Sequence, residues 1–249
     1  MKDTKEQMLF LEESKMTKNK VLDINWQSQE KTSGLVSGKD ALMIYNSLEE
    51  QARVGLWYDE NSKTMIGSTP IAVANLDLIA QKYEARTPNL RDLSRPEVMR
   101  IAQGKHYTDS RSLVARSRQD SNYSRNDSVL KTIYELAEQK LGSIKQPFMI
   151  EGFSFVPNPE DKKGYGLTLV PTSDFEVTED ERFDGKYDGQ KFSEVDEKGI
   201  PNFDRNGKRT WYAKSQGLSG LYFSYCLNLG SNSDILSGSS DFGRVVLLK

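Results

Sequence analysis

The sequence predicts an α+β protein, with helices mainly in the first half and a β-rich second half. Helix-start and helix-stop residues gather before residue 142, whereas from Gln146 onward apolar residues alternate with polar ones. Turn-forming pairs such as Asp-Gly and Asn-Gly also concentrate after Gln146. We divide the chain into an N-terminal arm and mainly helical portion, 1–86, and a domain over 87–249. The boundary near residue 86 leaves open that both parts form one domain.

The N-terminal portion is expected to contain two helices and a hairpin. Its first thirty or so residues are charged and lack a sustained period, which predicts a tail or a loosely packed arm. A helix is expected to begin at Ser37 and to run to about Ala52. The segment 54–73 predicts two strands joined by an Asp-Glu-Asn-Ser turn. A second helix is expected from about Ile71 to Glu84.

Two further helices are expected between residues 94 and 142. Ser94 as N-cap, Pro96 in the first turn and Gly104 as the stop delimit the first. Asn126 or Asp127 begins the second, which Gly142 ends. The apolar stripe of this second helix consists of Val129, Ile133, Leu136, Ala137 and Leu141.

The second half of the chain is expected to be built from strands and hairpins. FMIEGFSFVP (148–157) and YGLTLVP (165–171) alternate as strands do. The segment 180–209 is a long polar excursion with short turns, and RTWYAK (209–214) returns to a strand pattern.

Composition restricts the function classes. A net charge of −2 and a pI near 5.7 argue against a globally basic nucleic-acid binder. A single cysteine, Cys226, excludes an intramolecular disulfide and a cysteine-rich zinc site, and a single histidine, His106, removes most histidine-based metal and triad chemistry. No signal-peptide core and no apolar run of about 18 residues is found. We therefore expect a soluble protein without a membrane span, cytoplasmic or virion-associated unless it is exported by a non-classical route.

Two charged segments each allow two interpretations. Eight arginines lie between Arg86 and Arg125, and they could form a phosphate- or nucleic-acid-binding face. The interpretation as solvated faces or partners of acidic residues is favoured, because the net charge is negative and no nucleic-acid motif accompanies them. The acidic stretch from Glu179 to Asp204 could hold Ca²⁺, but it lacks EF-hand spacing, and its Asp-Gly and Asn-Gly pairs are typical of turns.

The sequence offers little for catalysis. His106 has Asp109 and Ser110 nearby, but sequence adjacency is no evidence for a triad. Cys226 has no basic neighbour that would lower its pKa. No phosphate loop, nucleophile elbow or dinucleotide fingerprint occurs. We therefore predict a non-enzymatic protein with no catalytic residue, no cofactor and no metal-binding residue.

The most informative segment is LSGLYFSYCLNLGSNSDILSGSSDFGRVVLLK (218–249). Leu227 and Leu229 alternate with Asn228 and Gly230, which predicts a strand with a buried leucine face. Further core residues are expected at Leu221, Leu236, Val245 and Leu247.

The residues between these leucines follow a restriction of the genetic code. From Gly217 to Leu248 there is no Lys, Glu, Gln, Met or Trp, although outward strand positions ordinarily favour Lys and Glu. An Asn codon in which only adenines change yields any codon ending in C or T, and such codons never encode those five residues. The positions that fit this set are Gly220, Phe223, Ser224, Tyr225, Cys226, Asn228, Gly230, Asn232, Ser233, Asp234, Ile235, Gly238, Ser240, Asp241 and Phe242.

The frame around those positions resembles the variable region of proteins diversified by a diversity-generating retroelement, in particular archaeal members. It reads L-S-x-L-Y-x-x-x-x-L-x-L-x-S-x-x-x-x-L-x-x-S-x-x-x-G-R-V-V and covers the variable region 218–248. The resemblance implies a C-type-lectin-like fold whose hypervariable surface residues bind a ligand. The disulfides and calcium ligands of animal lectins are absent, so the resemblance supplies no carbohydrate-binding residue.

These observations predict a diversified ligand-binding protein. Its variable positions would contact a macromolecular ligand, a protein surface before others, with Tyr222, Phe223, Tyr225 and Phe242 as anchors. The variable residues should lie exposed on one face, and Leu221, Leu227, Leu229 and Val245 should be buried. The alternative is a nucleic-acid-associated or phage-structural protein that uses the arginine-rich segment 86–125.

Overall fold

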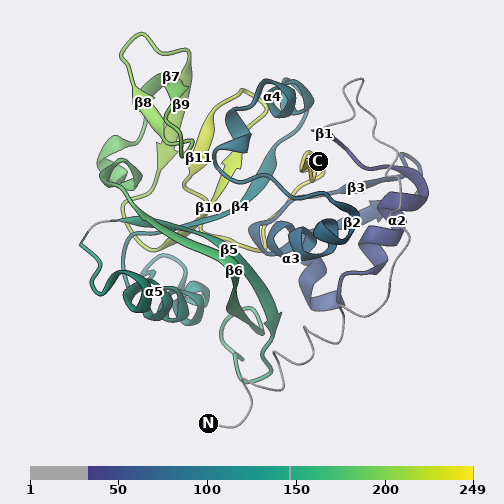
Figure 1. Cartoon of the computed structure of the whole chain (residues 1–249), viewed down its shortest axis with the longest axis horizontal. Coiled ribbons are helices and arrows are strands. Elements are labelled where there is room, and N and C mark those ends of the chain that lie inside the picture. Colours follow the sequence, from purple (N-terminus) through teal and green to yellow (C-terminus); the bar gives the residue numbers. More distant parts are fainter. Residues whose placement is uncertain (1–32, 146, 249) are drawn as a thin grey trace.

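The computed structural model describes residues 33–145 and 147–248. Its elements are short helices around one large sheet (Figure 1). In chain order the α-helices are α2 (Gly38–Asn46), α3 (Pro70–Ala80), α4 (Pro96–Ala102) and α5 (Asp127–Leu141). The strands are β1 (Ser33–Gly34), β2 (Trp57–Asp59), β3 (Thr64–Ile66), β4 (Thr108–Ala115), β5 (Phe148–Pro157), β6 (Leu167–Glu179), β7 (Lys191–Val195), β8 (Pro201–Phe203), β9 (Arg209–Ala213), β10 (Leu218–Phe223), β11 (Leu229–Ser231) and β12 (Leu247–Leu248).

Eight of these strands form one mixed sheet in the order β6-β5-β4-β10-β11-β9-β7-β8. Neighbouring strands are antiparallel except β11 and β9, which run parallel. Strand β10 lies inside the sheet, between β4 and β11. The predicted variable region therefore begins on a central strand rather than at an edge.

Helices α3 and α5 cover one face of this sheet. Ile71 of α3 and Ile133 of α5 belong to the same buried cluster as Leu113 of β4 and Ile150 of β5. Because side chains alternate along a strand, Val114 points to the opposite face. There it packs in a second cluster with residues of β9, β10 and α4.

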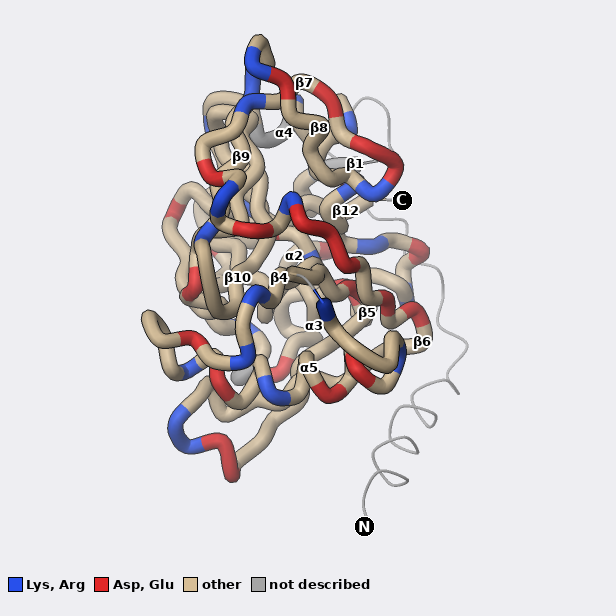
Figure 2. The backbone as a smooth tube through the Cα atoms, turned by 90° about the vertical axis from the view of Figure 1, so that its left-hand side faces the viewer, with Lys and Arg blue, Asp and Glu red and all other residues tan. Residues whose placement is uncertain are grey.

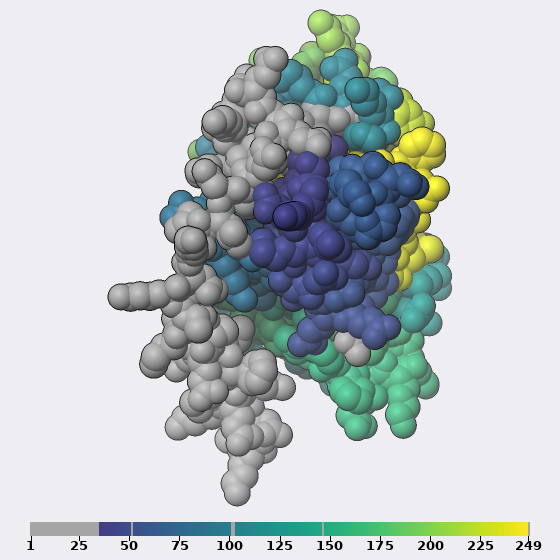
Figure 3. All heavy atoms as spheres, turned by 90° about the vertical axis from the view of Figure 1, so that its right-hand side faces the viewer, coloured from purple at the N-terminus to yellow at the C-terminus, as the bar shows by residue number. Residues whose placement is uncertain are grey.

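The N-terminal part and the end of the chain share a third cluster. Val36, Ile44 of α2 and Leu76 of α3 pack with Val245 and Leu247. Strand β1 pairs with β12, and Arg86 exchanges backbone hydrogen bonds with Leu248. Figure 3 shows this arrangement from outside, with yellow C-terminal residues beside blue residues of the N-terminal part.

The mixed architecture, the β2–β3 hairpin and helix α5 are confirmed. Two details of the prediction are wrong. The helix expected from Ser37 ends at Asn46, and a short 3₁₀ turn, Glu50–Arg53, follows it. Ser94 does not cap α4; Arg95 is the residue at the N-cap position, and the Ser94 hydroxyl accepts a hydrogen bond from Arg209 instead.

Strand β4 was not expected, although it lies in the middle of the sheet. Several of its polar side chains have partners within the protein. Ser110 Oγ donates to the carbonyl of Leu221 at 2.9 Å, and Arg111 forms an ion pair with Asp77 at 2.8 Å. Burial of paired polar groups costs far less than burial of unpaired ones, so such a segment can serve as a central strand.

Candidate functional site

Most apolar residues of the predicted frame lie inside the protein. Leu221, Leu229, Leu236 and Val245 are buried, as the sequence predicts. The prediction for Leu227 is wrong: this residue is half-buried, has a φ of 65° and belongs to a turn. The turn is closed by the amide of Leu227, which donates to Ser224 O at 2.9 Å. The strand expected over 227–230 therefore begins only at Leu229.

The exposed side chains of this region include most of the large apolar side chains that reach the surface. Among the described residues, five large hydrophobic side chains are exposed, and three occupy predicted variable positions: Tyr225, Ile235 and Phe242. The exposed fractions of Tyr225 and Phe242 are 57% and 67%. Small or polar residues lie exposed between them, namely Cys226, Asn232, Ser233, Gly238, Ser240 and Asp241.

Contacts with neighbouring segments locate the backbone at three of the predicted positions. The carbonyl of Tyr225 accepts from the amide of Gly104, and the carbonyl of Phe242 accepts from the amide of Tyr107. Gly104 and Tyr107 are three residues apart, so their Cα atoms are at most about 11 Å from each other. Asn126, next to α5, donates to the carbonyl of Asp234 at 2.9 Å. The backbone of this region therefore contacts both the segment that follows α4 and the residue that precedes α5.

Phe223 does not belong to this surface, and its prediction as an exposed anchor is wrong. Its side chain is completely buried in the cluster that contains Leu221 and Trp211. Residues two apart on a strand share a face, so Phe223 points inward with Leu221. The guanidinium of Arg209 lies 5.4 Å from the centre of the Phe223 ring.

The prediction that variable positions are exposed also fails at two glycines. Gly220 lies under the ring of Pro70, and Gly230 lies under the ring of Tyr222. These positions control how closely neighbouring rings approach the sheet, and they are not themselves at the surface.

Three other predicted variable positions are half-buried, and two of them hold backbone in place. Asn228 Oδ1 accepts from the amide of Thr210 at 2.7 Å, and Ser224 Oγ accepts from the amide of Asn228 at 3.2 Å. The Asp234 carboxylate lies 3.5 Å from Lys214 Nζ. The predicted variable positions thus divide into exposed side chains and structural supports.

Frame serines anchor the long segment between β11 and β12. Ser239 Oγ lies 3.0 Å from the hydroxyl of Tyr107 and accepts from the amide of Ser68 at 2.8 Å. The amide of Ser240 donates to the same tyrosine hydroxyl at 3.0 Å. The Ser240 side chain remains exposed. A frame serine and a variable serine, adjacent in the sequence, therefore have opposite surroundings.

A half-buried arginine binds the other two serines of the predicted frame. Arg116, the residue after β4, donates to Ser219 Oγ of β10 at 2.7 Å and to Ser231 Oγ of β11 at 2.8 Å. A third bond goes to the carbonyl of Phe183. Burial lowers the pKa of Arg116, but a guanidinium stays protonated in proteins, so it acts here as a fixed three-way link between strands.

An isolated carboxyl group lies beneath the same region. Asp109 of β4 is the register partner of Tyr222 and is buried, and its Oδ2 has no hydrogen-bond partner among the described residues. Burial raises the pKa of Asp109 to about 8, and the Ser68 hydroxyl opposes this shift. In the sequence Asp109 is only a near neighbour of His106, and its burial follows from its position on strand β4.

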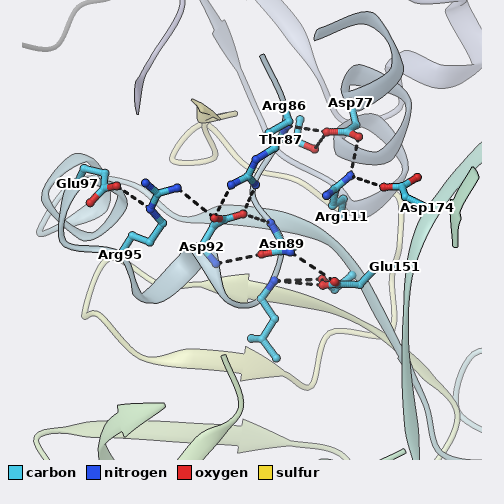
Figure 4. Close-up of polar contacts among 12 residues, drawn as sticks. Asp77, Arg86, Thr87, Asn89, Asp92, Arg95, Glu97, Arg111, Glu151 and Asp174 are labelled. Atoms are coloured by element: carbon cyan, nitrogen blue, oxygen red, sulfur yellow. Dashed lines mark hydrogen bonds and ion pairs between the residues drawn. The ribbon is translucent and has the colours of Figure 1, made fainter. Parts of the chain in front are cut away.

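The arginines of the segment 86–125 mostly contact the protein itself. Figure 4 shows Arg86 and Arg95 directed at Asp92, and Arg111 directed at Asp77 and Asp174. Arg95 also pairs with Glu97 at 2.7 Å. Arg118 pairs with Glu138, and Arg125 donates to the carbonyl of Gly164. Charges of both signs alternate along the backbone in Figure 2.

The acidic stretch 179–204 forms turns and ion pairs. Asp196 Oδ1 accepts from the amides of Lys198 and Ile200, and Asp204 Oδ1 accepts from that of Asn206. Arg182 lies 2.6 Å from Asp180 and 2.6 Å from Asp196. Within residues 33–145 and 147–248, no group of three or more His, Cys, Asp or Glu side chains is placed to hold a metal ion.

The two residues considered for catalysis are His106 and Cys226. Burial and the cations Arg244 and Lys105 lower the pKa of His106. Its Nδ1 has no hydrogen-bond partner among the described residues. Cys226 is exposed in the turn after β10. Their surroundings therefore give no triad arrangement in the part of the chain described.

Across the described residues, no helix combines the length and apolar character needed to cross a bilayer. Comparison of the chain with protein-family models, with curated proteins and with solved structures found no match.

Proposed function

We propose that this chain is a diversified ligand-binding protein whose exposed variable positions form a binding surface on a C-type-lectin-like scaffold. The observation that carries the proposal is the division within the variable region. Most leucines and the valines of the predicted frame are buried and its serines are hydrogen-bonded, whereas Tyr225, Ile235 and Phe242 at predicted variable positions are exposed. Diversification at exposed positions changes the surface and leaves the core intact.

A protein is the ligand that this surface suits best. Aromatic side chains with two rotatable bonds give large contact areas at low entropic cost, and interspersed serine and asparagine supply adaptable hydrogen bonds. The aromatic members are held by a sheet and by an anchored segment, so little backbone order is lost on binding. The arginine-rich segment is a weaker candidate because six of its guanidinium groups contact acidic side chains, carbonyls or hydroxyls of the protein.

The first test concerns the origin of the variation. Sequencing the DNA that flanks the gene should find a near-copy of the codons for 218–248 beside a gene for a reverse transcriptase. The copy should differ from those codons almost only at its adenines. Differences spread evenly over all four bases would contradict the retroelement.

The second test concerns binding. A displayed library varied at four exposed positions, Tyr225, Asn232, Ile235 and Phe242, should yield binders to immobilised lysozyme. The matched control library is varied at four exposed positions of α5, namely Ser128, Lys131, Glu135 and Gln139. Equal recovery of binders from both libraries would count against a dedicated binding surface.

A further inference from the structure

Tyr222 covers Gly230 on the neighbouring strand. The two residues are register partners on β10 and β11. A Cβ atom added to Gly230 would lie 2.3 Å from Tyr222 Cζ, 2.5 Å from Cε1 and 2.6 Å from the hydroxyl oxygen. The phenol ring therefore occupies the space that any other residue at position 230 would need. Its hydroxyl donates to Asn232 Oδ1 at 2.8 Å.

A second tyrosine flanks Gly230 on its other side. Tyr212 of β9 is the parallel register partner of Gly230, and 37% of its side chain is exposed. Burial together with Asp109 and Tyr212 raises the pKa of Tyr222, which agrees with close approach of these groups. Neither tyrosine is at a variable position, whereas Gly230 between them is.

We propose that residue 230 sets the position of Tyr222: glycine keeps the ring on the sheet, and any larger residue moves the phenol outward, away from the sheet. The biological meaning of this switch rests on the proposed function. A single codon change would then alter the binding surface twice, through the new side chain and through an unchanged tyrosine.

The ring, rather than the backbone, is the part that yields. Contacts under 3.0 Å do not occur between a real Cβ and its neighbours, so something must shift. The atoms in the way are the far end of a side chain that rotates about two bonds. The backbone of Gly230 is held by hydrogen-bonded strands on both sides. Rotation of Tyr222 costs one hydrogen bond to Asn232 and exposes a phenol, which is suited to contacts with protein surfaces.

Site-resolved nitration of tyrosines tests this without a ligand. Tetranitromethane treatment followed by peptide mass spectrometry should show Tyr222 modified several-fold faster in Gly230→Ser than in the unaltered chain. Tyr225, which is already exposed, should be modified at an unchanged rate. Gly238→Ser is the matched control because a Cβ there would meet only Ile235, at 3.1 Å or more, and it should not affect Tyr222. An unchanged Tyr222 rate in folded Gly230→Ser would overturn the proposal.

A double-mutant cycle covers the case in which Gly230→Ser folds poorly. If the ring is the obstacle, the fall in melting temperature caused by Gly230→Ser should disappear when Tyr222→Ala is also present. A fall of the same size in both backgrounds would locate the obstacle in the backbone and refute the switch.

A binding experiment distinguishes failure of the Tyr222 switch from failure of the proposed binding surface. Among lysozyme binders from a library that also varies position 230, Tyr222→Ala should weaken clones with Ser, Asn or Asp at 230 by about tenfold, equivalent to about 1.4 kcal/mol. Clones that keep glycine should change by less than about twofold. Equal losses in both groups refute the switch, whereas failure to obtain binders refutes the binding surface and leaves the nitration result standing.

Discussion

The guanidinium of Arg116 donates to the hydroxyl oxygen of Ser231 at 2.8 Å and thereby joins the residue after β4 to β11 across the strand that separates them. Ser219 on that intervening strand accepts from the same group and lies 2.8 Å from Ser231 Oγ. One half-buried cation thus binds the serines at two positions of the predicted frame.

Arg116→Ala should lower the free energy of unfolding by about 2–4 kcal/mol, because it removes charge-assisted hydrogen bonds and leaves a cavity. Urea unfolding followed by circular dichroism measures the loss. Arg118→Ala is the control: this arginine is exposed and its pair with Glu138 should contribute less than about 1 kcal/mol. Similar losses in the two variants would show that the hydrogen bonds of Arg116 stabilise the fold no more than an exposed ion pair does.

Helix positions could be read from the sequence because capping and periodicity are local. Helix α5 ends at Gly142, whose φ of 80° suits glycine, and its buried stripe follows the helical period. The prediction is wrong for Leu141, which was expected in that stripe and is exposed.

The candidate site was less accessible to sequence reasoning, because exposure depends on partners far along the chain. The codon pattern includes Phe223 with Tyr225, but strand alternation places Phe223 beside Leu221 in the core. Likewise, nothing local marks Tyr212 as a neighbour of Gly230, because a parallel pairing joins them. Strand β4 was not predicted, because its buried serines and half-buried Arg111 are residue types typical of surfaces. Only their distant partners explain their burial.

Stability should fall between about pH 4 and pH 8 through Asp109. Its pKa is 3.8 when unfolded and about 8 when folded, so in this range the folded state binds a proton that the unfolded state has lost. The contribution of Asp109 to the free energy of unfolding is fully present below pH 4. It declines by at most about 1.4 kcal/mol per pH unit until pH 8. Asp109→Asn, which stays neutral, should remove this slope and be more stable than the unaltered chain at pH 8. Urea titrations of both proteins at pH 5, 6, 7 and 8 measure the free energy of unfolding at each pH. If it depends on pH with the same slope in the unaltered chain and in Asp109→Asn, Asp109 is not the cause.

Frame serines and variable serines should differ in their effect on stability. Ser239→Ala removes bonds to Ser68 and Tyr107, so it should cost about 1–2 kcal/mol and accelerate amide exchange of Ser240. Ser233→Ala and Ser240→Ala alter exposed side chains and should cost less than about 0.5 kcal/mol. Thermal unfolding with hydrogen exchange distinguishes the two classes. Comparable costs for Ser239 and Ser240 would show that the frame is not defined by these contacts.

Two phenylalanines at predicted variable positions provide the sharpest contrast between supporting the fold and contacting a ligand. Phe223→Ala should cost about 3–5 kcal/mol, because a fully buried ring is lost from the core beside Leu221 and Arg209. Phe242→Ala should change the free energy of unfolding by less than about 0.5 kcal/mol, because two thirds of that side chain is already in solvent. In a lysozyme binder that retains phenylalanine at position 242, the same substitution should weaken binding about tenfold or more, as expected for an aromatic anchor. Calorimetric unfolding and surface plasmon resonance give the two quantities. A destabilised Phe242→Ala with unaltered affinity would show that the exposed aromatic residues support the fold rather than contact the ligand.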